Sequence, residues 1–514
     1  STLVTAAARY PDLEPRPLLN TADGEALETL GTPFARAARL ADVRRLSSRR
    51  TPGYVNPASV AVWVWRLVAD TTDRQPAASS GESNHYTFDP LGRDTPLCIA
   101  PAARRAGMAP AGLLDVPTPI TRGSLVRRLE DYYGPGRSIR VYRGSRLVPR
   151  SQILIGDLRA WHHSTPPYHV TVDPVRGRIA FPARHAPEDG VWVTYSRLTV
   201  GDIGGGHYER PRAQQPGAPA PYRVAARGAG FIRELGAALA QWAKDKQAGT
   251  AAGWAVIEIC DDGVYAEHLR VNLLPGERLE IRAAQGCRPI IIPLEERTNR
   301  PDALRVHGTL EPEQPKRGRA GAPELVLDGV WVAGAPLELA GALGGVTLRH
   351  CTLAPATCTA GLEAPHDRRD PSLVVTAIPC PLSIAMSVIG RIRVECAEVG
   401  HDPVPLSAVD SILDASDLRD GVVEGADRRR AWVCLSLART TVLGAARVRE
   451  VVRITDSLLV SALECERRQV GEVSFCYLPV SSRTPRRTSC QPDGVLAAVD
   501  QQIAHGELPH EDRD

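Results

Sequence analysis

The last third of the chain contains an imperfect eight-residue repeat, which constrains the fold more than any other feature. Its first, third and eighth positions are aliphatic or Ala, and its sixth is small. It occurs five times, at Val346–Leu353, Leu382–Ile389, Leu406–Leu413, Leu435–Val442 and Val452–Leu459. An earlier stretch, Leu325–Val332, matches at the apolar positions only. The unit is short, β-branched and alternating at its start, which is typical of a strand.

The spacing of the repeats indicates how they stack. Successive units start 21, 36, 24, 29 and 17 residues apart, and a repeat of about 20 residues with loops inserted at its corners is typical of a β-solenoid. The long intervals hold loop material at 354–381 and 414–430. The sequence therefore predicts a mainly β fold whose C-terminal part is a right-handed parallel β-helix. Unrelated strands of a β-sandwich are the alternative.

The rest of the chain is expected to precede and close this solenoid. The predicted regions are an N-terminal arm with a helix (1–50), an extended or β connector region (51–130), a small β module (131–200), a Gly/Pro-rich linker (201–225), the parallel β-helix with an N-terminal capping helix at 231–244 (226–495) and a C-terminal tail (496–514). Within the connector region, residues 71–84 are expected to be a polar loop. In the β module, 173–178 is expected to be a hairpin turn, since Asp-Pro opens turns and Gly177 tolerates positive φ.

Composition excludes several classes of function. The 514 residues carry a net charge of +3 with both signs mixed, so no nucleic-acid footprint is present. The eleven cysteines are scattered singly, which favours reduced core cysteine over a disulfide framework. No apolar run reaches the roughly 18 residues of a membrane span, and no signal peptide opens the chain. Because the chain starts at Ser1 without Met, a processed or partial N-terminus is expected.

The residues that suggest cofactor chemistry do not form recognised motifs. The β module contains His162, His163, His169 and His185 without metal-ligand spacing or an accompanying Cys. The Gly-rich stretch 201–206 lacks the Lys-Ser/Thr of a phosphate loop, so we expect a flexible connector there. We therefore predict neither a cofactor nor a metal.

Several residues are candidates for a protein interface instead. Trp63 and Trp65 lie on one face of a predicted strand at 60–67, where such a pair indicates core or interface rather than a ligand platform. The other interface candidates are Tyr54, Arg483, Arg486 and Arg487. We further expect residues 1–50, 71–84 and 201–222 to become ordered only when partners pack on them.

Seven sequence motifs together resemble one protein family. They are Gly53–Pro57 (GYVNP), Val62–Leu67 (VWVWRL), Tyr86–Leu97 (YTFDPLGRDTPL), Tyr132–Ile139 (YYGPGRSI), Val172–Pro182 (VDPVRGRIAFP), Asp202–Arg210 (DIGGGHYER) and Ser482–Asp493 (SRTPRRTSCQPD). In this order, over most of the chain, they resemble bacterial phage-tail-like proteins encoded with baseplate components of contractile injection systems. The chain departs from the family in lacking a helical region before residues 20–50 and in the position of the Cys in Val473–Leu478.

The resemblance implies a structural component of a phage-tail-like particle, in the baseplate or associated with the tail. It implies assembly in the cytoplasm with baseplate, tube or sheath subunits, followed by incorporation into the particle, and it supplies no catalytic residues. A carbohydrate-binding or polysaccharide-cleaving β-helix is the alternative, with Trp161 and Trp192 as further sugar platforms. Glycoside hydrolysis needs a matched pair of carboxylates, whereas the fifth repeat position reads His350, Met386, Asp410, Arg439 and Asp456. Asp410 with Asp414, Asp417 and Asp420 is interpreted as a solvated turn, so we predict no enzyme.

Overall fold

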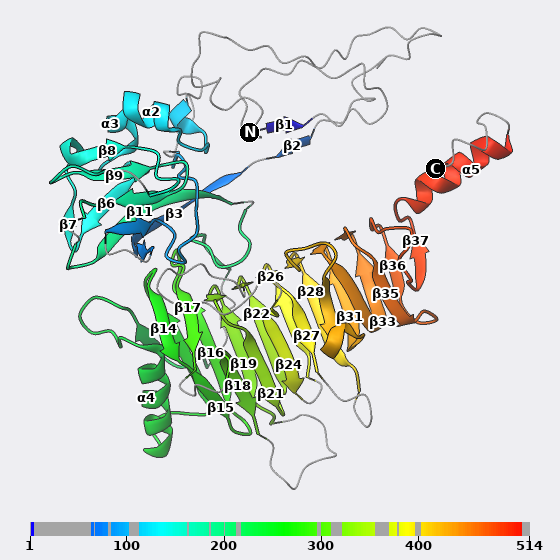
Figure 1. Cartoon of the computed structure of the whole chain (residues 1–514). Coiled ribbons are helices and arrows are strands. Elements are labelled where there is room, and N and C mark those ends of the chain that lie inside the picture. The colour runs from blue at the N-terminus through cyan, green and yellow to red at the C-terminus, as the bar shows by residue number, and fades with distance from the viewer. Residues whose placement is uncertain are drawn as a thin grey trace. The chain divides into compact units, whose positions relative to one another are not determined.

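The computed structural model describes residues 2–4, 63–65, 67–80, 84–101, 113–161, 164–183, 187–199, 201–211, 217–295, 300–309, 321–354, 370–377, 380–395 and 402–505. The described part is mainly β (Figure 1). The chain divides into two compact units, with the boundary between Gly201 and Asp202. The predicted helix of the N-terminal arm lies outside the described residues.

The first unit is built from two small sheets. One has the order β3 (Val68–Pro76), β11 (Val191–Thr199), β6 (Arg140–Arg143) and β7 (Arg146–Leu147). The other has the order β4 (Ala78–Ser79), β5 (His85–Thr87), β10 (Arg178–Ala180), β9 (Val170–Asp173) and β8 (Ile153–Ile155). Their core includes Phe88, Ile139, Val193 and Tyr195. The expected hairpin joins β9 to β10, and Gly177 has a φ of +60°.

Short elements complete this unit. They are β1 (Thr2–Val4), which pairs antiparallel with β2 (Trp63–Trp65), the helices α2 (Arg122–Arg127) and α3 (Leu129–Tyr132), and the 3₁₀ turns η3 (Leu113–Asp115) and η4 (Arg150–Gln152). The N-cap of α2 is Thr121, whose hydroxyl accepts the backbone N–H of Ser124.

The prediction of a polar loop at residues 71–84 is wrong. Most of β3 lies there and pairs with β11, and β5 pairs with β10 just beyond it. The strand was missed because its inward-facing side chains are polar: Thr72 and Gln75 are fully buried, and the Thr72 hydroxyl donates to the Tyr195 carbonyl at 3.3 Å. Buried polar groups with hydrogen-bond partners do not show the apolar alternation on which the prediction depended.

The second unit consists of three ladders of parallel strands, and in the middle of the stack each strand pairs with the strand three elements later in the chain. The first ladder contains β12 (Tyr222–Val224), β13 (Trp254–Ile259), β16 (Arg278–Ala283), β19 (Glu324–Asp328), β22 (Gly345–Arg349), β25 (Leu382–Ala385), β28 (Val404–Val409), β31 (Ala431–Ala438), β33 (Ala445–Thr455), β36 (Glu472–Ser474) and β37 (Arg486–Thr488). The second contains β15 (Arg270–Leu273), β18 (Leu304–Gly308), β21 (Leu337–Gly341), β24 (Leu373–Ala377), β27 (Ile392–Val394), β30 (Gly421–Gly425), part of β33 and β35 (Leu463–Arg467). The third contains β14 (Val264–His268), β17 (Ile290–Leu294), β20 (Trp331–Ala333), β23 (Thr352–Ala354), β26 (Val388–Ile389), β29 (Ile412–Asp414), β32 (Thr441–Leu443) and β34 (Leu458–Leu459). These large parallel sheets are consistent with a β-helix or solenoid.

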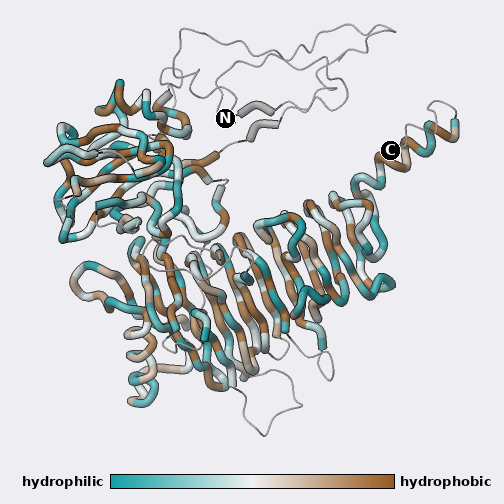
Figure 2. Tube along the Cα trace, viewed as in Figure 1, coloured by the Kyte–Doolittle hydropathy of each residue, from teal (hydrophilic) through white to brown (hydrophobic). Residues whose placement is uncertain are grey.

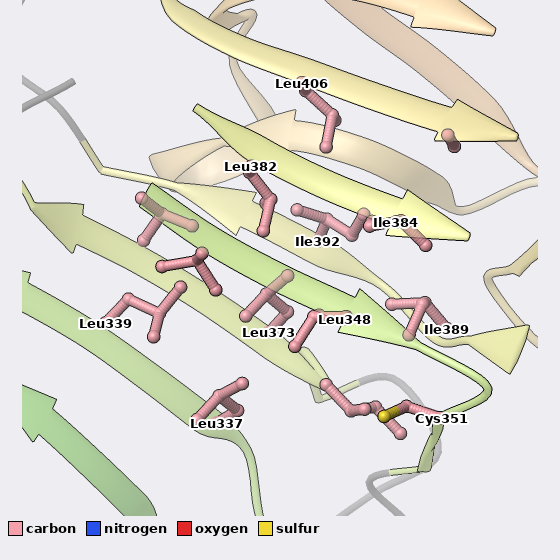
Figure 3. Packing of buried hydrophobic residues seen from close by; sticks show 14 of the residues in the cluster. Leu337, Leu339, Leu348, Cys351, Leu373, Leu382, Ile384, Ile389, Ile392 and Leu406 are labelled. Carbon is pink, nitrogen blue, oxygen red and sulfur yellow. The ribbon is translucent and has the colours of Figure 1, made fainter. Parts of the chain in front are cut away.

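The sequence repeat has the register of these ladders. Leu348 pairs with Ile384, Ile384 with Ala408, Ala408 with Leu437, and Leu437 with Ile454. These side chains belong to one apolar core (Figure 3). Burial alternates along the strands, as in β31, where every second residue is buried, and hydropathy alternates likewise (Figure 2). The stretch Leu325–Val332 is in the same register, since Leu327 pairs with Leu348.

The fifth repeat requires a one-residue correction. Its first position was assigned to Val452, but Leu435 pairs with Val451, and the register shifts before Ser436 pairs with Arg453. Val451 is fully buried, whereas Val452 is half exposed. A β-bulge places one extra residue in β33, and a fixed spacing of apolar positions cannot locate such an insertion.

Helices lie near both ends of the second unit. The capping helix predicted at 231–244 is α4 (Leu235–Gln247), which buries Leu235, Ala238 and Trp242 and contacts β12, β13 and β14. The carboxylate of Glu267 accepts the N–H groups of Leu235 and Gly236 at 2.9 and 2.8 Å, which satisfies the first free donors of the helix.

The C-terminal end differs from the prediction. Residues 486–488 form β37, and the expected tail at 496–514 begins within a second helix, α5 (Asp493–Ala504). One further 3₁₀ turn, η5 (Ala426–Arg428), precedes β31.

Candidate functional site

The motif Asp202–Arg210, hereafter the strap, lies across the repeats of the second unit. The N–H of Gly204 donates to the Met386 carbonyl at 2.8 Å, and the N–H of Gly205 donates to the Thr352 hydroxyl at 3.0 Å. A Cβ on Gly204, whose φ is +74°, would lie 2.5 Å from that hydroxyl oxygen. The glycines are therefore required because the backbone of the strap approaches the ladder closely.

The middle of the strap is fixed by Tyr208. Its hydroxyl donates to the Gly204 carbonyl at 2.6 Å and lies 2.9 Å from Nδ1 of His350. A phenol has one proton, so Nδ1 of His350 carries a proton and donates to the Tyr208 oxygen. Burial lowers the pKa of His350, which keeps this imidazole neutral at pH 7.

The end of the strap is held by His207 and Arg210. Nε2 of His207 lies 2.9 Å from Oδ2 of Asp262. The Arg210 guanidinium donates to the carbonyls of Ala283 and Ala284 at 3.2 and 2.6 Å. Burial on its own would raise the pKa of Asp262, but the hydrogen bond and charge of His207, with the N–H of Arg288, leave this pKa below its usual range.

The strap thus joins successive repeats. Its contacts run from Met386 in one repeat, through Thr352 in the preceding repeat, to Ala284 near the beginning of the stack. The prediction of a flexible connector at 201–206 is wrong, because residues 202–210 make these specific bonds. The exclusion of a phosphate loop is consistent with the geometry, since the N–H groups of Gly204 and Gly205 already have acceptors.

The fifth position of the repeat is distinguished by its backbone conformation. His350, Met386, Asp410, Arg439 and Asp456 all have φ between +47° and +51°, and each marks the turn between a first-ladder strand and a third-ladder strand. The side chains of Asp410 and Arg439 pair through two hydrogen bonds of 2.6 and 2.8 Å. The hydrogen bond from Arg439 lowers the pKa of Asp410, which opposes a general-acid role.

The acidic run that follows Asp410 serves local structure. The carboxylate of Asp414 accepts the N–H of Ser416 at 2.7 Å, and that of Asp417 accepts the N–H of Arg419 at 2.9 Å. Asp420 was expected in a solvated turn, but it is buried and lies 3.7 Å from the Arg428 guanidinium. Three of these carboxylates therefore stabilise turns or pair with arginine.

A cleft of about 260 Å³ lies beside β27 and β30 and is lined by Arg391, Arg393, Glu395, Glu424, Ala426, Asp427 and Arg428. Glu424 is buried, bonds to Arg391 and lies 3.5 Å from Arg447. Glu424 is therefore a buried carboxylate held between two arginine side chains.

The predicted interface residues have different environments. Arg483 and Arg486 are exposed, whereas Arg487 bonds to the carboxylate of Asp493 at 3.1 Å and to the carbonyl of Ser482 at 2.5 Å. Tyr54 lies outside the described residues. Trp63 and Trp65 form β2, and nothing in the described contacts tests their interface role.

The other predicted positions do not converge. Trp161 stacks on His85 with ring centroids 4.6 Å apart and lies under the Arg178 guanidinium, so it packs within the first unit. His162, His163 and His185 lie outside the described residues, and the Nδ1 of His169 lies 2.9 Å from the carbonyl of Pro167. In the described part of the chain, no group of three or more His, Cys, Asp or Glu side chains is arranged to hold a metal.

Six of the nine cysteines that the structure describes are buried, as expected, whereas Cys260, Cys287 and Cys434 are half-buried. Cys351, Cys380, Cys465, Cys476 and Cys490 belong to the apolar core of the second unit. Burial raises the pKa of Cys351 to about 12, so its thiol remains protonated at neutral pH and is a poor nucleophile.

Comparison of the chain with protein-family models, with curated proteins and with solved structures found no match. Among the helices that the structure describes, none is both long and apolar enough to span a membrane.

Proposed function

We propose that this chain is a structural component of a phage-tail-like contractile injection particle, in its baseplate or associated with its tail. It acts by assembling with other subunits. The observation that carries the proposal is the strap. Its motif residues His207, Tyr208 and Arg210 direct their polar groups at the backbone and side chains of the repeats. These bonds fix the strap to the repeats, as is expected of a rigid scaffold.

The architecture favours the same proposal. Three parallel ladders, with helix α4 covering the first strands and a strap across several repeats, make a stiff body. We assign the ladders to a right-handed parallel β-helix, because connections between parallel strands of one sheet are almost always right-handed.

The direct test uses the source bacterium. A tagged chain should co-purify with intact sheath-containing particles and be located on them by immunogold labelling. The variant Gly204→Val, which displaces the strap, should reduce incorporation. Gly217→Val is the matched control, since Gly217 also has positive φ but open space around it. Particles of normal composition and yield from a strain without the gene would contradict the proposal.

Binding or cleavage of polysaccharide is the second candidate, and the cleft favours it. Its lining includes the carboxylates Glu395, Glu424 and Asp427, and carboxylates bind or cleave sugars in many proteins. The double variant Asp410→Asn/Asp456→Asn tests the fifth repeat position, and Glu424→Gln tests the cleft. Release of oligosaccharide by the wild-type chain, lost in either variant, would favour the enzyme over the scaffold.

A further inference from the structure

Four apolar side chains near the C-terminal end of the second unit form an exposed cluster, hereafter the apolar patch. They are Leu458, Phe475, Tyr477 and Val480, with exposed fractions of 43%, 64%, 47% and 63%. Leu458 and Tyr477 are bridged on neighbouring strands, and Phe475 has a φ of +55° at the turn before Tyr477. Apolar side chains exposed together at one end of a domain indicate a binding surface.

The patch continues a face that is covered elsewhere. The pairing of the third ladder places Thr352, Val388, Ile412, Thr441, Leu458 and Tyr477 in one row. The strap lies against this row at Thr352, whose hydroxyl accepts the N–H of Gly205 at 3.0 Å, and a Cβ on Gly204 would lie 3.3 Å from Cγ2 of Val388. Ile412 and Thr441 are half-buried, and at the C-terminal end of the row Leu458 and Tyr477 are exposed.

The apolar face of helix α5 complements the apolar patch. It is 12 residues long, and none of its residues is buried. Leu496, Val499 and Ile503 are three and four residues apart, which places them on one face of the helix. Isolated helices of about 12 residues are only marginally stable in water, so α5 requires a partner for this face.

The start of α5 is fixed to the closing repeat of the second unit. The N–H of Gly494 donates to the Cys490 carbonyl at 3.1 Å, the N–H of Val495 donates to the Pro492 carbonyl at 2.9 Å, and Arg487 pairs with Asp493 at 3.1 Å. Gln491 is bridged to Tyr477, so the helix begins at the edge of the patch. Figure 1 shows α5 extending from the end of the ladders.

We propose that α5 of one copy packs its apolar face on the apolar patch of a second copy, and that the contact is reciprocal. Such an interface is self-complementary, as two-fold dimers require. Charge also fits, because α5 leads into the acidic sequence 506–514 while Arg483 and Arg486 are exposed on the closing repeat. The inference goes beyond the proposed function, because the dimer requires no other subunit.

Sedimentation of the purified full-length chain over a range of concentrations tests the dimer. The wild type should pass from monomer to dimer. Phe475→Asp/Tyr477→Asp and Leu496→Asp/Ile503→Asp should each weaken the dimer at least tenfold, because a charge is placed in the apolar contact. Val126→Asp, at an exposed apolar position of α2, should leave it unchanged.

Mixing the two double variants tests reciprocity. One variant retains an intact helix and the other an intact patch, so an equimolar mixture should form a heterodimer although neither variant dimerises alone. Circular dichroism checks that both remain folded, and Phe475→Asn is the milder patch variant because Asn adopts positive φ readily.

Three outcomes would overturn the inference. They are a wild type that stays monomeric at all concentrations, a dimer that persists in both double variants, and a monomeric Leu496→Asp/Ile503→Asp variant whose patch is more exposed than that of the wild-type monomer. The last would show that α5 packs on its own chain. The isolated chain is used throughout, so a negative result does not count against incorporation into a particle.

Discussion

Single residues with positive φ mark the turn in each repeat. The position occupied by His350, Met386, Asp410, Arg439 and Asp456 continues as Phe475 in the next repeat, and all six have φ near +50°. A left-handed conformation costs a residue with a Cβ roughly 1–2 kcal/mol, and glycine escapes this cost. The varied side chains at this position are therefore explained by the backbone, which the sequence alone does not reveal.

Substitutions at Asp456 should follow this conformation. Asp456→Gly should raise the free energy of unfolding by up to about 1 kcal/mol, and Asp456→Ile should lower it by about 1 kcal/mol because β-branched residues avoid positive φ. Asp456→Asn should change it by less than about 0.5 kcal/mol. Urea unfolding measures all three, and equal effects of Gly and Ile would contradict the explanation.

Asp262 should make stability depend on pH in the acid range. The pKa of Asp262 is lower in the folded chain than its ordinary value near 3.9. Its contribution is therefore fully present above about pH 5 and is lost as the pH falls through the folded pKa. Unfolding free energies measured between pH 2 and 7 should show this loss in the wild type. Asp262→Asn should lack it, and parallel pH profiles of the two proteins would refute it.

The core residues of the repeat were predictable from the sequence. Leu437 pairs with Ala408 and Ile454 in the buried row, so Leu437→Asp should abolish soluble folding, because a buried unpaired charge costs several kcal/mol. Ser436→Asp is the matched control, since the neighbouring side chain points to the other face of the strand. Expression and size-exclusion chromatography compare the two, and a soluble, cooperatively melting Leu437→Asp would count against the buried row.

At the scale of elements, the sequence predicted the strands of the repeat and missed β3, the strap and α5. The strands of the module and the ladders follow alternating patterns that depend only on local burial. The strap depends on contacts of Gly205 and Tyr208 with residues 147 and 142 positions away in the chain, which periodicity cannot show. Helix α5 overlaps the region 496–514 that was expected to be a tail, although Leu496, Val499 and Ile503 have helical spacing.

We expect that the strap can be displaced from the ladders without unfolding them. Arg210 is buried with its guanidinium on backbone carbonyls, so phenylglyoxal, which modifies accessible arginine side chains, should not react with it in the wild type. Gly204→Val should make Arg210 reactive, because the new Cβ would lie 2.5 Å from the Thr352 hydroxyl oxygen and displace the strap. Gly217→Val should leave Arg210 protected, and equal modification of Arg210 in both variants, measured by mass spectrometry, would mean that the strap is not held by this contact.

At the scale of the whole molecule, the chain contains two separate cores. The core of the first unit includes Phe88 and Tyr195, and that of the second runs from Val224 to Cys490 without sharing a residue with it. The predicted module at 131–200 was too short, because β3 and β5 precede it in sequence and join it in space. Long-range antiparallel pairing of this kind leaves no local signal in the sequence.

Separate cores predict separate unfolding transitions. Each unit buries its own apolar residues and has its own sheet pairing, so cooperativity should extend within a unit and not across the boundary at Gly201 and Asp202. Phe88→Ala should lower the melting temperature of one calorimetric transition, and Leu304→Ala should lower that of the other, each by the several degrees that a loss of about 3 kcal/mol produces. A single transition lowered by both variants would show that the two cores fold as one.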